Sequence, residues 1–174
     1  MPRKIRFEDS IKVSDQAIEE IVAWLKGFNE TVAVRNVEAD PEFQKIDVDL
    51  IWVTKKREYK IEVKADQWHN TGNFFFETHS NKEKNTPGCF LYTEADFVFY
   101  YFIVPKNLYC LPMPRTREWF QSKMHKFKES STTTPVNGEQ YTTVGRLVPI
   151  DKVMRQVPGV KKVQLKNKFK LMFF

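Results

Sequence analysis

The pattern of hydrophobic and polar positions first indicates a helix near the start of the chain. Apolar residues from Ile18 to Leu25 recur at the three- and four-residue spacing of one helix face. Ser14 is a suitable N-cap and Gly27 a suitable terminator, so these two residues bound the predicted helix. A strand is predicted next, over residues 31–37.

The rest of the chain is dominated by apolar runs of strand length. Two runs, residues 46–53 and 60–66, flank a short basic turn and predict a hairpin. The further predicted segments are a strand over 73–78, a strand hairpin over 95–104 and 107–113, a helix over 114–130, a surface loop over 130–143, a short strand and short helix over 145–160, and a strand over 161–174. This order of helix, strand cluster and helix predicts an α/β fold with a mixed sheet flanked by helices.

The first hairpin carries acids inside its apolar runs. Because successive strand residues point to opposite faces, Glu62 and Lys64 share one face of the second strand. Residues directly opposite each other on paired strands have Cβ atoms roughly 5 Å apart. A turn that places Val53 opposite Glu58 fixes two further pairs, Asp49 with Glu62 and Asp47 with Lys64.

Two carboxylates held side by side favour a bound cation. Hard divalent ions take carboxylate oxygens, so Asp49 and Glu62 are predicted ligands of Mg²⁺, with Mn²⁺ expected to substitute. The backbone carbonyl of Val63 is a further predicted ligand. Such a metal lowers the pKa of a bound water and offsets charge on a phosphate, while the ammonium of Lys64 orients or activates that water. The predicted chemistry is phosphodiester hydrolysis.

The same residues carry a family resemblance. An acid in one strand, a short basic turn and then IEVKA resembles the core of the PD-(D/E)xK nuclease superfamily, with Asp49, Glu62 and Lys64 at the motif positions. The proline that precedes the first acid in the family pattern is absent, since Val48 stands there. The resemblance covers about residues 14–77. It implies a restriction-endonuclease-like α/β/α sandwich with a central mixed sheet, a divalent metal, and cleavage of DNA or, less often, RNA.

Other polar residues near the hairpin are further candidates. Glu20, on the preceding helix, is a candidate metal ligand, although a solvated helix flank explains it as well. Asp47 is either a second acid of the site or the salt-bridge partner of Lys64. The remaining candidates, for contacts with the scissile phosphate, the water or the residues that bind them, are Asp66, Gln67 and Glu77.

Composition narrows the class of protein. A length of 174 residues predicts a single domain over 1–174, and a hydrophobic fraction of 41% argues against disorder. No apolar run reaches the length of a membrane span, and the first ten residues lack the apolar core of a signal peptide. Cys89 and Cys110 are predicted to be buried free thiols in a reducing cytoplasm, with a disulfide left open.

Charge favours an acidic partner. The net charge is +6 and the pI about 9.2, which suits nucleic acid, although many small proteins are basic without binding it. The leading hypothesis is a Mg²⁺-dependent endonuclease that acts on DNA rather than RNA, as a homodimer where both strands are cut. The alternative is a nuclease-like protein without catalysis, which binds nucleic acid or uses the hairpin charges in an assembly.

Overall fold

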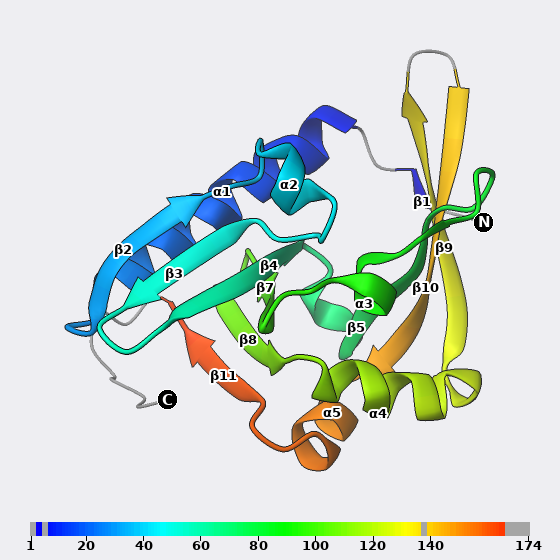
Figure 1. Cartoon of the computed structure of the whole chain (residues 1–174). Coiled ribbons are helices and arrows are strands. Elements are labelled where there is room, and N and C mark those ends of the chain that lie inside the picture. Colours follow the sequence, from blue (N-terminus) through cyan, green and yellow to red (C-terminus); the bar gives the residue numbers. More distant parts are fainter. Residues whose placement is uncertain (1–2, 5–6, 137–138, 166–174) are drawn as a thin grey trace.

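The structure is a computed structural model that describes residues 3–4, 7–136 and 139–165, and it is mixed α/β with two sheets (Figure 1). The central sheet has six strands in the order β11-β8-β7-β4-β3-β2. Their bounds are β2 Thr31–Asn36, β3 Leu50–Thr54, β4 Glu58–Asp66, β7 Phe97–Phe102, β8 Asn107–Pro112 and β11 Lys161–Gln164. The β4–β7 pair is parallel and its neighbours pair antiparallel, so the central sheet is mixed as predicted.

A second sheet, which the sequence did not predict, has five strands in the order β1-β9-β10-β5-β6. Their bounds are β1 Arg3–Lys4, β5 Asn73–Asn81, β6 Thr86–Pro87, β9 Lys128–Val136 and β10 Glu139–Pro149. The helices are α1 Phe7–Lys26, α2 Pro41–Gln44, α3 Cys89–Tyr92, α4 Arg115–Lys123 and α5 Ile150–Gln156, with 3-10 turns at His69–Thr71 and Met124–Lys126.

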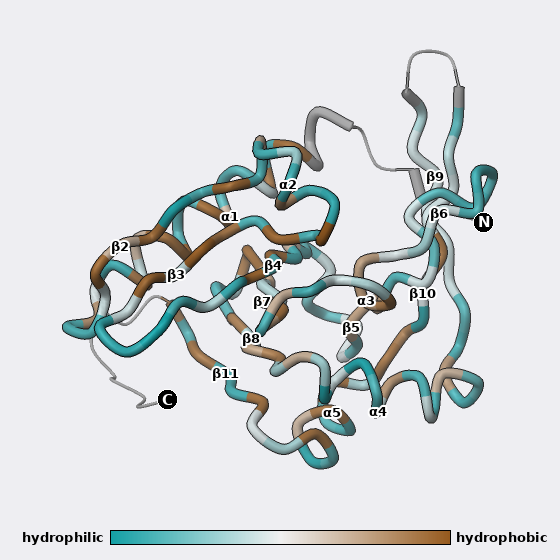
Figure 2. Tube along the Cα trace, in the orientation of Figure 1, coloured by the Kyte–Doolittle hydropathy of each residue, from teal (hydrophilic) through white to brown (hydrophobic). Residues whose placement is uncertain are grey.

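The register of the β3–β4 hairpin is the predicted one. Val53 lies opposite Glu58, and Leu50 lies opposite Ile61. Leu50 and Trp52 of β3 pack with Ile61 of β4 in the core beneath α1, and a slip by one residue would turn side chains of this core to the other face of the sheet. Hydrophobic residues follow β3 and also β7, which pairs with the other edge of β4 (Figure 2).

Helix α1 covers one face of the central sheet (Figure 1). Its buried residues Ala17, Ile21 and Leu25 pack against Ile61 and Val63 of β4 in one core cluster. The predicted stop at Gly27 is confirmed, but Ser14 is not the N-cap, because the helix begins at Phe7. Val13 packs on the same cluster, so the apolar face that holds the helix on the sheet begins before Ser14.

The other face of the central sheet packs on the second sheet and on α3, α4 and α5. Phe74 and Phe76 of β5 lie in one buried cluster with Tyr100 of β7. The Phe76 ring stacks on Phe90 of α3 with 3.8 Å between centroids. The aromatic runs are therefore core strands, and strands as well as helices cover this face.

The predicted surface loop over 130–143 is wrong, since residues 130–136 belong to β9 and residues 139–143 to β10, and the two strands pair antiparallel. Thr133 pairs with Thr142 and Thr132 with Thr143. Threonine is β-branched and favours strands despite its polarity, which explains why a reading based on polarity missed the hairpin. The predicted helix over 114–130 is shorter, since α4 ends at Lys123. Most of the predicted strand over 161–174 lies outside the described residues, although β11 is present.

Cys89 and Cys110 are both buried free thiols, as predicted. Within the described residues, no helix combines the length and the apolar character that crossing a membrane requires.

Gly88 lets α3 approach β5 closely. Its N–H donates to the Thr78 carbonyl oxygen at 2.9 Å, and a Cβ at position 88 would lie 2.5 Å from the carbonyl carbon of Glu77. The backbone at Gly88 has φ −80° and ψ 155°, which any residue can adopt. The requirement for glycine at this position is therefore steric.

Gly88→Ala tests this contact. At a compatible φ, alanine normally stabilises a protein by about 0.4–1 kcal/mol, because it restricts the unfolded chain. Here the clash with the Glu77 backbone is expected to lower the free energy of unfolding by about 1–3 kcal/mol instead. Urea unfolding measures the difference, and an alanine variant as stable as the wild type would contradict the close packing.

Candidate metal centre

Asp49 directly precedes β3, at the point where that strand begins beside β4. Its N–H donates to the Ile61 carbonyl oxygen at 2.9 Å, and its Oδ2 accepts a hydrogen bond from the Val63 N–H at 2.8 Å. The carboxylate thus takes the place of a strand carbonyl at the end of the ladder. Because the N–H and C=O of one strand residue point to the same edge, the Val63 carbonyl faces this edge as well.

Glu62 is the most deeply buried acid of the group. It is 7% exposed and lies on the face of β4 opposite the one that α1 covers. One step beyond the β3–β4 ladder, its carboxyl group lies near that of Asp49, whose charge acts on it. Its Oε2 atom has no hydrogen-bond partner, although buried polar atoms are nearly always paired.

Asp47 approaches the same point from the turn before β3. Its backbone has φ 56°, a left-handed conformation that aspartate tolerates. Thr93, directly after α3, fixes this turn by donating its hydroxyl to the Asp47 carbonyl oxygen at 2.7 Å. The Asp47 carboxyl hydrogen bonds with the Tyr92 hydroxyl, yet its Oδ2 atom is buried without a partner.

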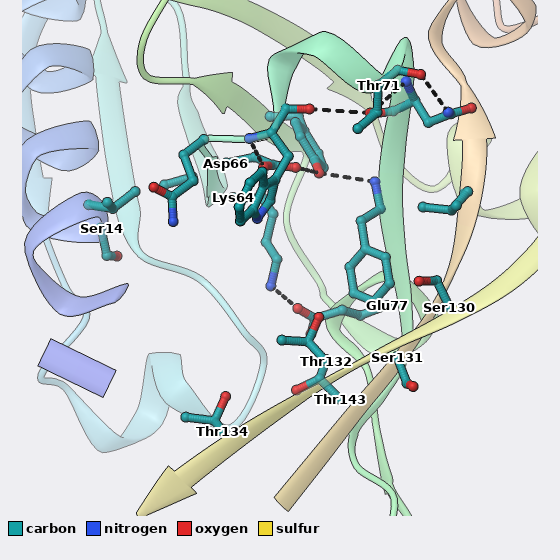
Figure 3. A pocket seen from close by; sticks show the side chains of 18 of the residues that line it. Ser14, Lys64, Asp66, Thr71, Glu77, Ser130, Ser131, Thr132, Thr134 and Thr143 are labelled. Atoms are coloured by element: carbon teal, nitrogen blue, oxygen red, sulfur yellow. Dashed lines mark hydrogen bonds and ion pairs between the residues drawn. The ribbon is translucent and has the colours of Figure 1, made fainter. Parts of the chain in front are cut away.

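The expected ion pair between Asp47 and Lys64 does not form. β3 begins only at Leu50, where its pairing with β4 stops at Ile61, so Asp47 lies before the strand and is not placed opposite Lys64. The Lys64 ammonium instead forms an ion pair with Glu77 on β5, the neighbouring strand of the second sheet (Figure 3). Glu77 is therefore the charge partner of the motif lysine.

Burial dominates the electrostatics of these acids. It raises the pKa of Glu62 well above its ordinary value, and the nearby charges of Asp49 and Asp47 raise it further. It also raises the pKa of Asp49, and that of Asp47 from 3.8 to about 6. The cluster therefore favours any ligand that compensates negative charge, either a proton or a cation.

Lys64 is held in its charged form. Burial alone would lower its pKa, but the charge of Glu77 and the hydrogen bond to it raise the pKa above the ordinary value. At neutral pH the side chain is an ammonium ion. It can attract phosphate oxygens and orient a water molecule, whereas proton abstraction would require it to be neutral.

A cavity of about 510 Å³ opens beside the Lys64–Glu77 pair (Figure 3). Hydroxyl groups from the β9–β10 hairpin line its far side, among them Ser130, Thr132 and Thr143. Asp66 and Gln67 line the near side, at the end of β4. The cavity offers hydrogen-bond donors next to Lys64, the one cation among the described residues that line it.

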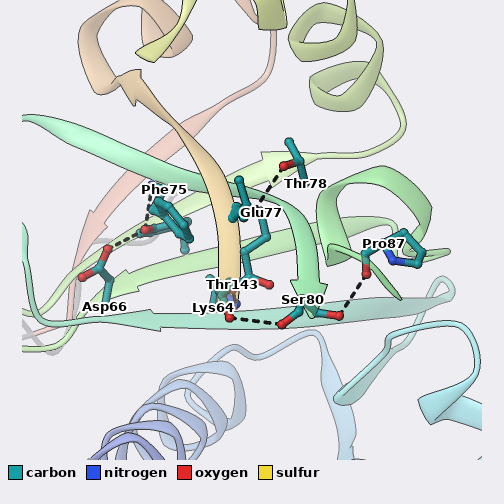
Figure 4. A network of polar contacts seen from close by, with 10 residues as sticks. Lys64, Asp66, Phe75, Glu77, Thr78, Ser80, Pro87 and Thr143 are labelled. Carbon is teal, nitrogen blue, oxygen red and sulfur yellow. Dashed lines mark hydrogen bonds and ion pairs between the residues drawn. The ribbon is translucent and has the colours of Figure 1, made fainter. Parts of the chain in front are cut away.

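Asp66 is tied into the wall of this cavity. It accepts a hydrogen bond from the Tyr100 hydroxyl, and that hydroxyl accepts one from the Phe75 N–H (Figure 4). The chain of bonds links β4 and β7 of the central sheet to β5 of the second sheet. The contacts of Asp66 thus hold the two sheets together, while Gln67 remains at the cavity surface.

Glu20 lies apart from the cluster. It accepts hydrogen bonds from Tyr101, from Gln16 at 3.0 Å and from Lys106 at 2.9 Å, on the face of the sheet that α1 covers. Burial would raise its pKa, but these three donors together lower it. Because Glu62 points to the opposite face, Glu20 is not placed to share a metal with it.

The sequence did not predict that Cys89 would lie beside these acids. The ligand atoms of Asp47, Glu62 and Cys89 all lie within 4.8 Å of one another. Cys89 begins α3, so its position depends on how Gly88 packs on β5. The only signal in the sequence was a cysteine directly after a Pro-Gly pair, and this signal does not show which strand the cysteine approaches.

Comparisons with protein-family models, with curated proteins and with solved structures give no match to this chain.

The donor set fits a divalent cation. Asp49 and Glu62 supply carboxylate oxygens in mutual contact, and Asp47 and Glu62 each carry a buried oxygen without a partner. Hard cations take such oxygens together with backbone carbonyls and water. Asp49, Glu62 and the Val63 carbonyl remain its predicted ligands.

Asp47→Asn tests the electrostatic cost of the cluster. In the folded protein the Asp47 pKa is raised, so the group lowers stability as pH increases from about 4 to 6 and the penalty remains above pH 6. Without added metal, the free energy of unfolding of the variant at pH 7.5 is expected to exceed that of the wild type by about 1–3 kcal/mol. Below pH 4 the two proteins are expected to have the same free energy of unfolding. Thermal unfolding at both pH values measures this.

Asp15→Asn, at an exposed position of α1, is the matched control and should leave stability nearly unchanged. An Asp47→Asn variant less stable than wild type at pH 7.5 would show that the carboxylate is compensated in the fold.

Proposed function

We propose that this protein is a Mg²⁺-dependent endonuclease of the restriction-endonuclease-like type, which hydrolyses phosphodiester bonds of DNA in preference to RNA. The observation that carries the proposal is the contact between the Asp49 and Glu62 carboxyl groups, with Lys64 following on the same face of β4. The β3–β4 hairpin supports this arrangement, because Asp49 and Glu62 lie directly beyond its last pair, Leu50 with Ile61. Their order in the sequence is that of the PD-(D/E)xK motif.

Each residue has a role that its chemistry supports. A divalent ion held by Asp49, Glu62 and the Val63 carbonyl would lower the pKa of an attacking water and offset charge on the phosphate. The Lys64 ammonium would attract a phosphate oxygen, and Glu77 would hold the ammonium in position. The role supported for Lys64 is electrostatic, because its pKa is raised and the proton is retained.

The cavity beside Lys64 supports a phosphodiester substrate. Hydroxyl donors on β9 and β10 face the ammonium across it, and hydroxyl groups are common partners of phosphate oxygens and sugars. The net charge of +6 would attract a polyanion over longer distances. A homodimer remains a prediction for the case in which both strands are cut.

Plasmid nicking tests the proposal. With Mg²⁺ or Mn²⁺, the wild-type protein is expected to convert supercoiled DNA to nicked or linear forms. Asp49→Asn and Lys64→Met are each expected to lower the rate by about 100-fold or more, because each removes a charge that acts on the reacting phosphate or its metal. The same assay with single-stranded RNA measures the preference for DNA.

Lys55→Met, in the exposed β3–β4 turn, is the control for loss of a lysine from the same hairpin. Equal cleavage by the wild type and both site variants would overturn the assignment of the residues. Salt-sensitive DNA binding without cleavage under any divalent ion would instead favour the alternative, a nuclease-like protein that binds nucleic acid without catalysis.

A further inference from the structure

A second group of ligand atoms adjoins the proposed Mg²⁺ position. The carboxylate oxygens of Asp47 and Glu62 and the Sγ of Cys89 lie within 4.8 Å of one another. Ligands of a tetrahedral ion with bonds of 2.0–2.3 Å stand roughly 3–4 Å apart, so a small inward movement would close them around one ion. The three come from different elements: the turn before β3, the middle of β4 and the start of α3.

One carboxylate oxygen of each acid in this group lacks a hydrogen-bond partner. Glu62 is 7% exposed, and its Oε2 accepts no hydrogen bond. The Oδ2 of Asp47 is likewise buried without a donor. Two neighbouring carboxylate oxygens without donors are a costly arrangement for a folded protein, and a bound cation removes the cost at both. They therefore point to a ligand between them.

The position of Cys89 is fixed from both ends of α3. Gly88, directly before it, packs on the backbone of Glu77 and donates to Thr78. Thr93, directly after the helix, donates its hydroxyl to the Asp47 carbonyl oxygen and its N–H to the Cys89 carbonyl oxygen. The helix that carries the thiol is thus attached both to β5 and to the turn that carries the first acid. The thiol itself is 6% exposed.

We propose that Asp47, Glu62 and Cys89 form a binding position for a thiophilic divalent cation such as Zn²⁺, Co²⁺ or Cd²⁺. A thiolate ligand favours these ions strongly over Mg²⁺, which takes oxygen ligands. On binding, the thiol loses its proton to solvent and a sulfur–metal bond forms. The ion would bring together three elements, two of which carry acids whose charges otherwise repel.

This position would also regulate the endonuclease, a consequence that depends on the function proposed above. Glu62 belongs both to this group and to the Asp49 side, where Mg²⁺ is expected. An ion bound at Cys89 would occupy a carboxylate that the Mg²⁺ position requires. Zn²⁺ at low concentration is therefore expected to inhibit Mg²⁺-dependent cleavage.

Titration of the full chain with Co²⁺, after treatment with a chelator, tests the proposal. Thiolate ligation gives a sulfur-to-cobalt charge-transfer absorption in the near ultraviolet. The band is expected in the wild type, saturating at one ion per chain, and it should disappear when Zn²⁺ displaces the cobalt. Saturation with Co²⁺ without the band would overturn the proposal.

Variants assign the band to its ligands. Cys89→Ser should abolish it, whereas Cys110→Ser, the matched change at the other buried thiol, should leave it intact. Asp47→Asn keeps the thiol and should weaken Co²⁺ binding by about tenfold or more. Circular dichroism of each variant checks folding. A band that survives Cys89→Ser would place the sulfur ligand elsewhere and overturn the proposal.

Cleavage assays separate this inference from the proposed function. In Cys89→Ser, Mg²⁺-dependent cleavage should persist and inhibition by Zn²⁺ should be lost. A wild type with the cobalt band but no cleavage would support the thiolate position and refute the endonuclease. Cleavage without the band would do the reverse.

Discussion

The burial of the Glu62 carboxyl is the constraint on which the site depends. A carboxylate placed between two sheets loses its water and must gain other partners. The fold supplies another acid, Asp49, instead of a donor, and leaves one oxygen of Glu62 without a partner. Such an arrangement lowers the stability of the folded protein, and destabilising arrangements of this kind are concentrated at functional sites. The simplest compensation is a cation.

The packing of the two sheets sets the surroundings of this carboxyl. β5 crosses the face of β4 that α1 leaves uncovered, and it brings Glu77 to the Lys64 ammonium. The aromatic core beside it, with Phe76 stacked on Phe90, holds α3 against the same strand. The acids around Glu62, the Lys64 ammonium and the cavity therefore all lie where the two sheets pack against each other. The cation of Lys64 separates the buried acids from the polar cavity.

The sequence predicted those parts of the site that depend on local geometry. The β3–β4 register follows from alternation and a short turn, and its last pair, Leu50 with Ile61, lies directly before Asp49 and Glu62. The partners of Lys64 and Glu62 from outside the hairpin could not be predicted, because Glu77 and Cys89 arrive through packing between sheets. Glu20 was placed on the correct helix, but only the structure shows that the helix covers the opposite face. The β9–β10 hairpin was missed because threonine-rich strands look like loops when polarity alone is considered.

The central claim is that the carboxyl cluster around Glu62 binds a divalent cation. Isothermal titration calorimetry with Mn²⁺ tests it most directly, because it requires neither a nucleic-acid substrate nor turnover. The wild type is expected to bind Mn²⁺ with saturable heat, and Glu62→Gln, which removes the charge and keeps the shape, is expected to abolish that heat. A wild type that binds no Mn²⁺, or a Glu62→Gln variant that binds it equally well, would contradict the account.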